Sequence, residues 1–270
     1  MATSMLTQHD LGVLDKIKDP ESGPSAPILI DDSLPRDPKI TDTTVYQRVA
    51  QRERDIILQI QELELQIAGL KPSPKSQASL TRYEACITSL DELVEDFPNY
   101  ASARNNRAQA LRRVFGDGML VNGLDTKNAP TPLHAEVSAS QAVAASKKVL
   151  DDLDTAITLL CPRTPFAGLS PQAAKTLSQA YTQRGALYHL TSKSLSSDSG
   201  KVQLRVDASR KEAEWTVGDF EENASRNFML GGRYGNEVAR QLAVSTNPVA
   251  KLCGDMVREA MKKEYSGTMI

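Results

Sequence analysis

The chain has 270 residues, of which 5% are aromatic and 24% are charged, and its formal net charge at pH 7 is -2. A chain of this length forms one or two domains, and with so few aromatic residues its core must come from Ala, Leu, Ile and Val. The even balance of 32 basic and 34 acidic residues, without a Lys/Arg-rich stretch, speaks against nucleic-acid binding.

Two further features bear on location. No apolar run approaches the ~20 residues that span a bilayer, and the opening MATSMLTQHD has neither the basic start nor the apolar segment of a secretory signal. We therefore expect a cytoplasmic protein, with nuclear access possible, and no membrane contact. Three scattered cysteines (Cys86, Cys161 and Cys253) without a C-x-x-C motif indicate buried, reduced thiols.

Residues 1–44 are rich in Asp, Pro and Ser, with eight acidic against four basic residues. Such a composition buries too little apolar surface to offset the entropy of ordering, so we predict a disordered tail. One apolar island (Leu11, Val13, Leu14 and Ile17) is compatible with a short helical turn that docks on the body or on a partner. A chance cluster of apolar residues in a disordered tail explains it equally well.

From residue 45 to residue 70 the pattern is helical, because apolar residues recur at alternating steps of four and three from Ile56 to Leu70. Two interpretations compete. The stripe is either a heptad seam for a coiled-coil dimer or the first helix of a pair that packs on residues 77–97. Only about two heptads are sustained, which favours the helix pair, and Gly69 and Pro72 then mark its end.

A repeated spacing follows. NYASARNNRAQAL (residues 99–111) is echoed by AYTQRGALYHL (residues 180–190), so that Ala108 and Gly185 occupy one small-residue position and Arg107 and Arg184 precede them. A tetratricopeptide repeat is a helix pair of about 34 residues with small residues at the helix contact and a proline at its exit. The VLDDLDTAITLLCP segment, ending at Pro162, fits the second helix of such a pair.

This spacing predicts an all-α tetratricopeptide-repeat solenoid of about three helix pairs over residues 45–235, with capping helices over 236–270. The further helices are expected at 101–115, 138–161, 171–190, 206–226, 236–244 and 247–265. Insertions near 116–137 and 191–205 interrupt the pairs, and long loops of this kind are usually functional or disordered. Gly231, Gly232 and Gly235 are expected to break the chain between helices.

The last predicted helix has strong end signals, with Asn247 as N-cap and Pro248 at the first helical position. Its apolar stripe (Val249, Leu252, Met256, Ala260 and Met261) suits a cap that hides the open face of the terminal repeat.

Several segments resemble one family in order: NNRAQAL (105–111), DDLDTAI (151–157), QRGALY (183–188), DFEENA (219–224) and the specific ending NPVAKLCGDM (247–256). Together they are similar to the tetratricopeptide repeat protein 36 family. The resemblance implies a non-enzymatic adaptor of three repeats. Members are described as binding cytosolic heat-shock chaperones of the seventy-kilodalton class, and the family is associated with tyrosine catabolism. It also implies a protein partner.

Repeats of this kind hold acidic chaperone tails in a carboxylate clamp of Lys, Arg and Asn side chains, because charge-assisted hydrogen bonds are about twice as strong as neutral ones. Here only Asn106 matches the clamp, and Gln179 and Gln183 stand where the third repeat would supply cations. The sequence therefore favours a groove contact of another kind.

Residues three and four apart lie side by side on a helix, so each leading helix offers one strip to a concave groove. The partner-groove candidates are Ser102, Asn105, Asn106, Gln109, Arg113, Gln179, Thr182 and Gln183. The competing interpretation is that these amides are merely solvated. Arg107 and Arg184 are expected to be partly buried, with their guanidinium groups hydrogen-bonded.

Catalysis is not expected. The chain has three histidines and lacks G-x-S-x-G, phosphate-loop, H-E-x-x-H and dinucleotide motifs, so we predict no catalytic residue, cofactor or metal. Adjacent acidic pairs such as Asp151–Asp152 are interpreted as solvated. Two alternatives to a monomeric chaperone-linked adaptor remain: self-association through the 56–70 seam, or a scaffold regulated by phosphorylation of the serine-rich loop 192–199 or of Ser73.

Overall fold

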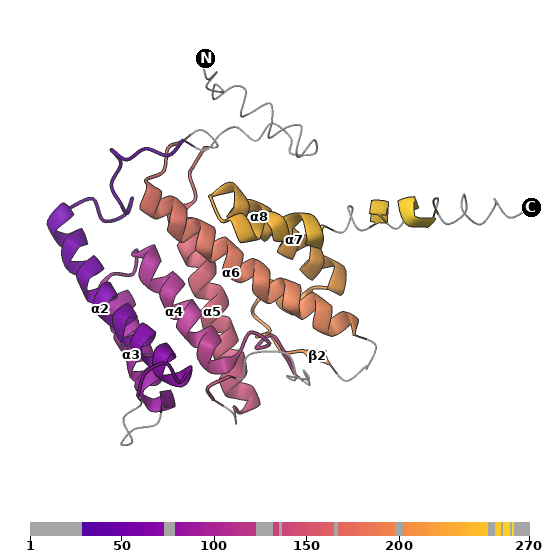
Figure 1. Ribbon diagram of the computed structural model, residues 1–270, viewed down its shortest axis with the longest axis horizontal. Helices are drawn as coiled ribbons and strands as arrows, with labels where there is room; N and C mark the ends of the chain where they lie inside the picture. Colours follow the sequence, from indigo (N-terminus) through magenta and orange to yellow (C-terminus); the bar gives the residue numbers. More distant parts are fainter. Residues whose placement is uncertain are drawn as a thin grey trace, which may run out of the picture.

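The computed structural model describes residues 29–72, 79–122, 132–134, 137–164, 167–197, 202–247, 252–254, 256–259 and 261. These residues form mainly α-helices, which confirms the all-α class (Figure 1). The helices are α2 (Thr43–Ile67), α3 (Ser79–Asp96), α4 (Ala101–Phe115), α5 (Ala139–Leu160), α6 (Pro171–Ser196), α7 (Val217–Arg233) and α8 (Glu237–Thr246), with a 3-10 turn at Lys211–Glu214 and two short strands, β1 (Val121–Asn122) and β2 (Gln203–Leu204).

The helices succeed one another in space in chain order, as in a solenoid. Each helix from α2 to α7 packs against the next, and α4 also contacts α6. In Figure 1 the three leading helices α2, α4 and α6 follow each other from left to right with their N-terminal ends toward the top. None of the described helices is long and apolar enough to cross a membrane.

The apolar stripe of α2 is used inside the first helix pair. Ile56 and Leu63 are buried, and Ile60 and Ile67 pack against the same core, while Leu70 is 74% exposed. The dimer interpretation of this seam is therefore wrong, because its central residues already have partners. Gly69, at φ +73°, ends the helix as expected, since this left-handed conformation favours glycine.

Close helix contact explains the repeated small residue. Ala108 is fully buried, and a Cβ added to Gly185 would lie 3.1 Å from the Phe228 ring and 3.2 Å from Asn227 Cβ. The predicted small-residue positions are thus the places where α4 and α6 approach their neighbours. A larger side chain at either position would force the helices apart, because protein cores are close-packed.

The arginines that precede these small residues are hydrogen-bonded to acidic and amide groups of neighbouring helices, as predicted; Arg107 is buried and Arg184 is partly buried. Arg107 donates from Nε and Nη2 to both carboxylate oxygens of Asp152, at 2.7 and 2.6 Å, and from Nη1 to Asp91 at 2.8 Å. Arg184 bonds Asn227 and Asp154 in the same way one repeat later. Asp152 is only 1% exposed, so its assignment to a solvated acidic pair was wrong: it is the counter-ion that Arg107 requires.

The described part of the predicted disordered tail, residues 29–42, lies against the body. Ile30 forms a β-bridge with Leu169, Asp31 N donates to the Leu169 carbonyl at 2.9 Å, and Ser170 Oγ donates to the Arg36 carbonyl at 3.2 Å. Composition failed here because a few hydrogen bonds to a preformed helix end order a segment that lacks a core of its own. The apolar island at 11–17 lies outside the described residues.

The two insertions meet each other. Met119, Leu120 and Val121 are buried, and β1 pairs with β2 of the second insertion in antiparallel register. Helix α6 runs to Ser196, so the first part of the predicted loop is helical, and Ser192 and Ser194 are buried. Phosphorylation of these two serines is therefore excluded in the folded chain, whereas Ser196 and Ser197 are exposed. Ser73 lies outside the described residues.

The next predicted helix, 206–226, was misplaced: the α-helix observed there, α7, begins at residue 217 and ends at residue 233. Its place is taken by the 3-10 turn and by α7, which begins after the Thr216 cap. Gly231 and Gly232 lie inside α7 and do not break it. A Cβ at Gly232 would lie 2.7 Å from the Arg240 backbone of α8. They permit α8 to pack closely on α7, and only Gly235, at φ +102°, turns the chain.

The predicted terminal cap is not seated on the repeat in the residues that can be compared. Leu252, Met256 and Met261, three of the five residues of its predicted apolar stripe, are exposed, Met256 by 63%. Figure 1 shows these short helical pieces beyond the body of the molecule. Two cysteines also differ from expectation: Cys86 is buried, but Cys161 and Cys253 are exposed free thiols.

The close approach of α7 and α8 makes Gly232→Ala a test of the packing. We expect the substitution to lower the free energy of unfolding by about 1–3 kcal/mol, because the added methyl group overlaps the α8 backbone. Gly218→Ala is the matched control in the same helix, where the nearest atom is Thr216 Oγ1 at 3.7 Å. Its stability should be unchanged or slightly raised in urea denaturation, since alanine favours helix; equal losses in both variants would contradict this packing.

Candidate partner-binding face

The candidate site is the surface formed by α2, α4 and α6, here called the leading-helix face. The seam between α4 and α6 is a chain of hydrogen bonds between side-chain amides. Asn105, which is 1% exposed, donates from Nδ2 to Gln179 Oε1 at 3.3 Å and accepts at Oδ1 from Gln183 Nε2 at 2.8 Å. Arg112 Nη1 donates to Gln183 Oε1 at 3.2 Å. These bonds fix the spacing and register of the two helices.

The seam between α2 and α4 centres on the carboxylate of Glu53, which is 9% exposed. Tyr100 OH donates to Oε2 at 2.6 Å, Asn106 Nδ2 donates to Oε1 at 2.8 Å, and Ser102 adds a third bond. Burial raises the pKa of Glu53 above its ordinary value of 4.5, although these three bonds oppose the shift. Burial and the Glu53 charge likewise raise the pKa of Tyr100.

This seam bears on the prediction that Asn106 belongs to a carboxylate clamp. Its amide N–H, which a carboxylate clamp would offer to an acidic peptide, is already donated to Glu53. An incoming carboxylate would also meet the Glu53 charge at short range, and like charges repel strongly where water is excluded. Toward the other end of the face, Arg113 is held by Glu64, with Nε 2.9 Å from Oε1. The face is therefore unsuited to clamp an acidic tail.

The structure brings five of the eight predicted groove residues into the two seams: Ser102, Asn105, Asn106, Gln179 and Gln183. Arg113 pairs with α2, and the Thr182 hydroxyl donates to the Ser178 carbonyl of its own helix at 2.7 Å. Gln109 and Gln179 are exposed. Sequence reasoning missed Glu53, although its place beside Ile56 on the buried stripe of α2 was a signal that it points inward.

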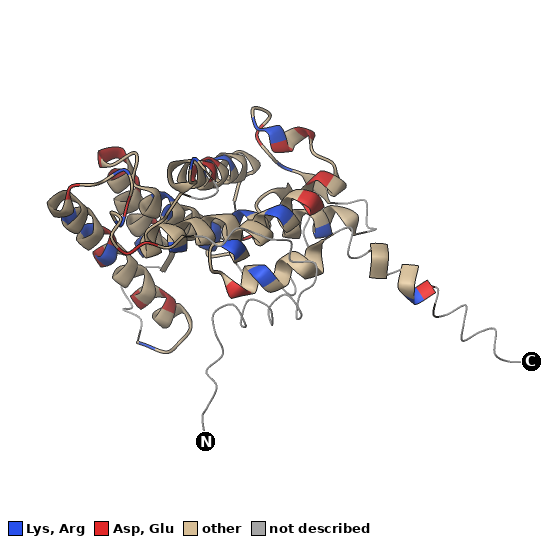
Figure 2. Ribbon diagram, turned by 90° about the horizontal axis from the view of Figure 1, so that it is seen from above, with Lys and Arg blue, Asp and Glu red and all other residues tan. Residues whose placement is uncertain are grey.

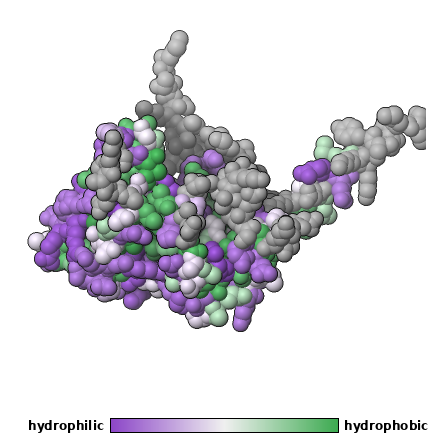
Figure 3. All heavy atoms as spheres, turned by 90° about the horizontal axis from the view of Figure 1, so that it is seen from below, coloured by the Kyte–Doolittle hydropathy of each residue, from purple (hydrophilic) through white to green (hydrophobic). Residues whose placement is uncertain are grey.

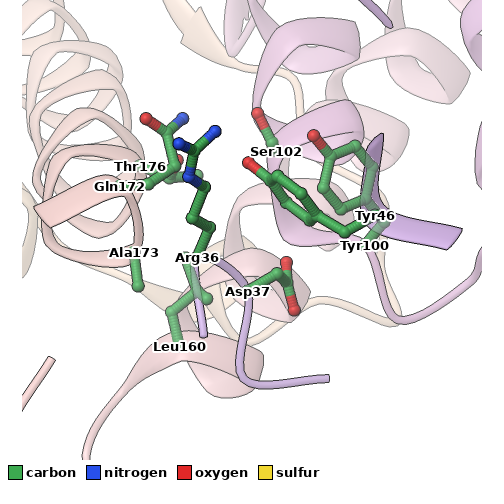
Figure 4. Close-up of a pocket in the computed structure, with 9 residues that line it drawn as sticks. All are labelled: Arg36, Asp37, Tyr46, Tyr100, Ser102, Leu160, Gln172, Ala173 and Thr176. Atoms are coloured by element: carbon green, nitrogen blue, oxygen red, sulfur yellow. The ribbon is translucent and has the colours of Figure 1, made fainter. Parts of the chain in front are cut away.

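A small pocket lies near the N-terminal ends of the three leading helices (Figure 4). Its walls come from Tyr46 of α2, Ser102 of α4, Thr176 of α6, and Arg36 and Asp37 of the N-terminal segment. The free space inside it is about 10 Å³, room for about one water molecule and far below the roughly 300–1,000 Å³ typical of pockets for small organic ligands. The side chains that line the pocket therefore already occupy most of it.

Seen from above, basic and acidic residues are interspersed over the helices (Figure 2). Seen from below, hydrophilic residues predominate, with hydrophobic ones showing between them (Figure 3). Within the described ranges, no group of three or more His, Cys, Asp or Glu side chains is placed to hold a metal ion. Among the exposed groups of α4 and α6 are the amides of Gln109 and Gln179.

No family model and no solved structure matches the chain. An Aspergillus fumigatus protein named L-tyrosine degradation gene cluster protein hmgX is 33% identical over 264 residues, which covers 98% of this chain and 95% of the relative. Tetratricopeptide repeat protein 36 of Danio rerio is 27% identical over 259 residues, covering 96% of this chain and 95% of the relative.

The chain belongs to the tetratricopeptide repeat protein 36 family. A second relative of that name, from Xenopus tropicalis, is 25% identical over 259 residues and extends over 96% of this chain and 89% of its own. The match to these relatives runs over nearly the whole length of the chain. The family resemblance predicted from the NNRAQAL and NPVAKLCGDM segments is confirmed.

The raised pKa of Glu53 leads to a pH-dependent prediction. A carboxylate with a raised pKa in the folded state is stabilised by protonation, so folding stability falls as pH rises from the ordinary value of 4.5 through the raised value. In Glu53→Gln this dependence should be absent. We therefore expect the stability of the wild-type chain to fall relative to Glu53→Gln between pH 4.5 and neutral pH in urea denaturation. A parallel pH dependence in both proteins would contradict the assignment of a buried, unneutralised carboxylate.

Proposed function

We propose that this chain is a non-enzymatic, cytosolic adaptor that serves tyrosine breakdown by binding a partner protein on its leading-helix face. The observation that carries the proposal is the pair of exposed amides, Gln109 and Gln179, on helices whose register is fixed by buried polar seams. The metabolic assignment rests on the fungal relative, whose name places it in an L-tyrosine degradation gene cluster.

Amide side chains suit the recognition of a polypeptide. Each carries donors and an acceptor and can therefore bond both the N–H and the C=O of an extended backbone. Gln179 Oε1 is already held by Asn105, which limits the rotamers that this side chain can lose on binding. A preorganised surface binds more tightly because less conformational entropy is lost on association.

A heat-shock chaperone is the partner that we propose, but held by a contact other than a clamp on its acidic tail. Asn106 is engaged by Glu53, and no cation replaces the glutamines at positions 179 and 183. A folded part of the chaperone, or an extended segment away from its tail, suits the neutral amides better than a carboxylate does.

Binding of purified chaperone to the immobilised full-length chain tests the proposal. We expect intact chaperone and chaperone that lacks its acidic tail to bind with similar affinity, and Gln109→Arg to weaken both about tenfold, equivalent to about 1.4 kcal/mol. Ala144→Arg is the matched control, because it adds the same charge at an exposed position of α5 outside the leading-helix face.

Three outcomes would contradict this account. Binding that requires the acidic tail would restore the clamp. Equal weakening by Gln109→Arg and Ala144→Arg would remove the leading-helix face as the site. Absence of binding by either chaperone form would eliminate the chaperone as the partner.

A further inference from the structure

The N-terminal segment, residues 29–42, here called the strap, crosses the top of the leading-helix face from α6 to α2. At the α6 end its backbone is bonded on both sides of Leu169: Asp31 N donates to the Leu169 carbonyl, and Leu169 N donates to the Leu29 carbonyl, each at 2.9 Å. A Cβ at Gly168 would lie 3.2 Å from Leu34 Cδ1. The strap thus fits closely where α6 begins.

Asp37 of the strap supplies a cap that α4 lacks locally. Tyr100, the N-cap residue of α4, makes no side-chain capping bond. The Asp37 carboxylate, 4% exposed, accepts instead from the backbone N–H of Ala101, as well as from those of Lys39 and Ile40. A carboxylate at this place is favoured because the first N–H groups of a helix lack partners and carry partial positive charge.

Arg36, an exposed residue, lines the pocket beside this cap. Figure 4 shows its side chain extending between Tyr46 and Ser102 on one side and Gln172 and Thr176 on the other. Its guanidinium is hydrogen-bonded to the Tyr46 hydroxyl, and its carbonyl accepts from Ser170 Oγ at 3.2 Å. This dipeptide, which lies in a bend of the strap, therefore contacts all three leading helices.

The strap holds the face through few contacts. Asp32, Ser33, Pro35, Arg36, Pro38 and Lys39 are all exposed, and Asp37 is the buried residue in its middle. A short segment that is tethered next to its binding site occupies that site because its effective concentration is high. A free peptide with the same arginine–aspartate pair must therefore compete with the tethered strap.

We propose that the top of the leading-helix face is a peptide-binding subsite for an adjacent arginine–aspartate pair, which the strap occupies in cis and from which a partner carrying such a pair displaces it. This inference deepens the proposed function and rests on it for the existence of a partner. The site itself is defined by the chain's own contacts. The aspartate caps α4, and the arginine enters the pocket between Tyr46 and Thr176.

Binding of a fluorescein-labelled peptide of residues 29–42 to the full-length chain tests the subsite. The strap-release variant is Arg36→Ala/Asp37→Ala, and the matched control is Asp32→Ala/Lys39→Ala, which also removes one acidic and one basic side chain but from residues that do not line the pocket. We expect the peptide to bind the release variant at least tenfold more tightly than the wild-type chain or the control. A peptide carrying Arg36→Ala and Asp37→Ala should not bind any of them.

Arg36→Ala alone keeps the α4 cap and serves if the double variant does not fold, as judged by circular dichroism; it should show a smaller gain of the same sign. Equal peptide binding by all proteins, or none by the folded release variants, would overturn the subsite. The outcome is separable from that of the proposed function: peptide binding to the release variant without chaperone binding leaves the subsite standing and removes the chaperone.

Discussion

The bidentate ion pair between Arg107 and Asp152 holds the centre of the molecule together. The Arg107 guanidinium joins α4 to α5 through Asp152 and to α3 through Asp91, with nitrogen-to-oxygen distances of 2.6–2.8 Å. A buried pair adds little stability compared with apolar residues, but removing one partner typically costs about 3–5 kcal/mol. Its effect is specific: only one register of the helices satisfies it. Arg184 repeats the arrangement with Asp154 and Asn227, so successive repeats are fixed in the same way.

The leading-helix face depends on that register. With α4 fixed against α3 and α5, its polar side chains meet α2 through Glu53 and α6 through Asn105. The groups that a generic repeat groove would offer to a ligand are largely engaged in these seams. The exposed amides and the strap-filled pocket are what remains, which is why the account places recognition there and assigns no clamp to an acidic tail.

Much of the fold could be predicted from local pattern, and much of the site could not. The repeated spacing of Arg107–Ala108 and Arg184–Gly185 predicted both the helices and the buried arginines, because a small residue marks close contact and a neighbouring arginine must be neutralised. The counter-ion Asp152 and the carboxylate Glu53 were missed, since their burial depends on which helices pack together. The strap was missed because its order comes from anchors more than sixty residues away in sequence, at Ala101 and Leu169.

Site-specific photo-crosslinking tests the central claim most directly, because it locates the partner without weakening the contact. A photoreactive amino acid would replace Gln109 on the leading-helix face or Ala144 on α5, each in the full-length chain mixed with purified heat-shock chaperone. The account predicts a covalent adduct from position 109 and none from position 144. An adduct from position 144 alone would contradict it and place the partner on the opposite layer of the solenoid.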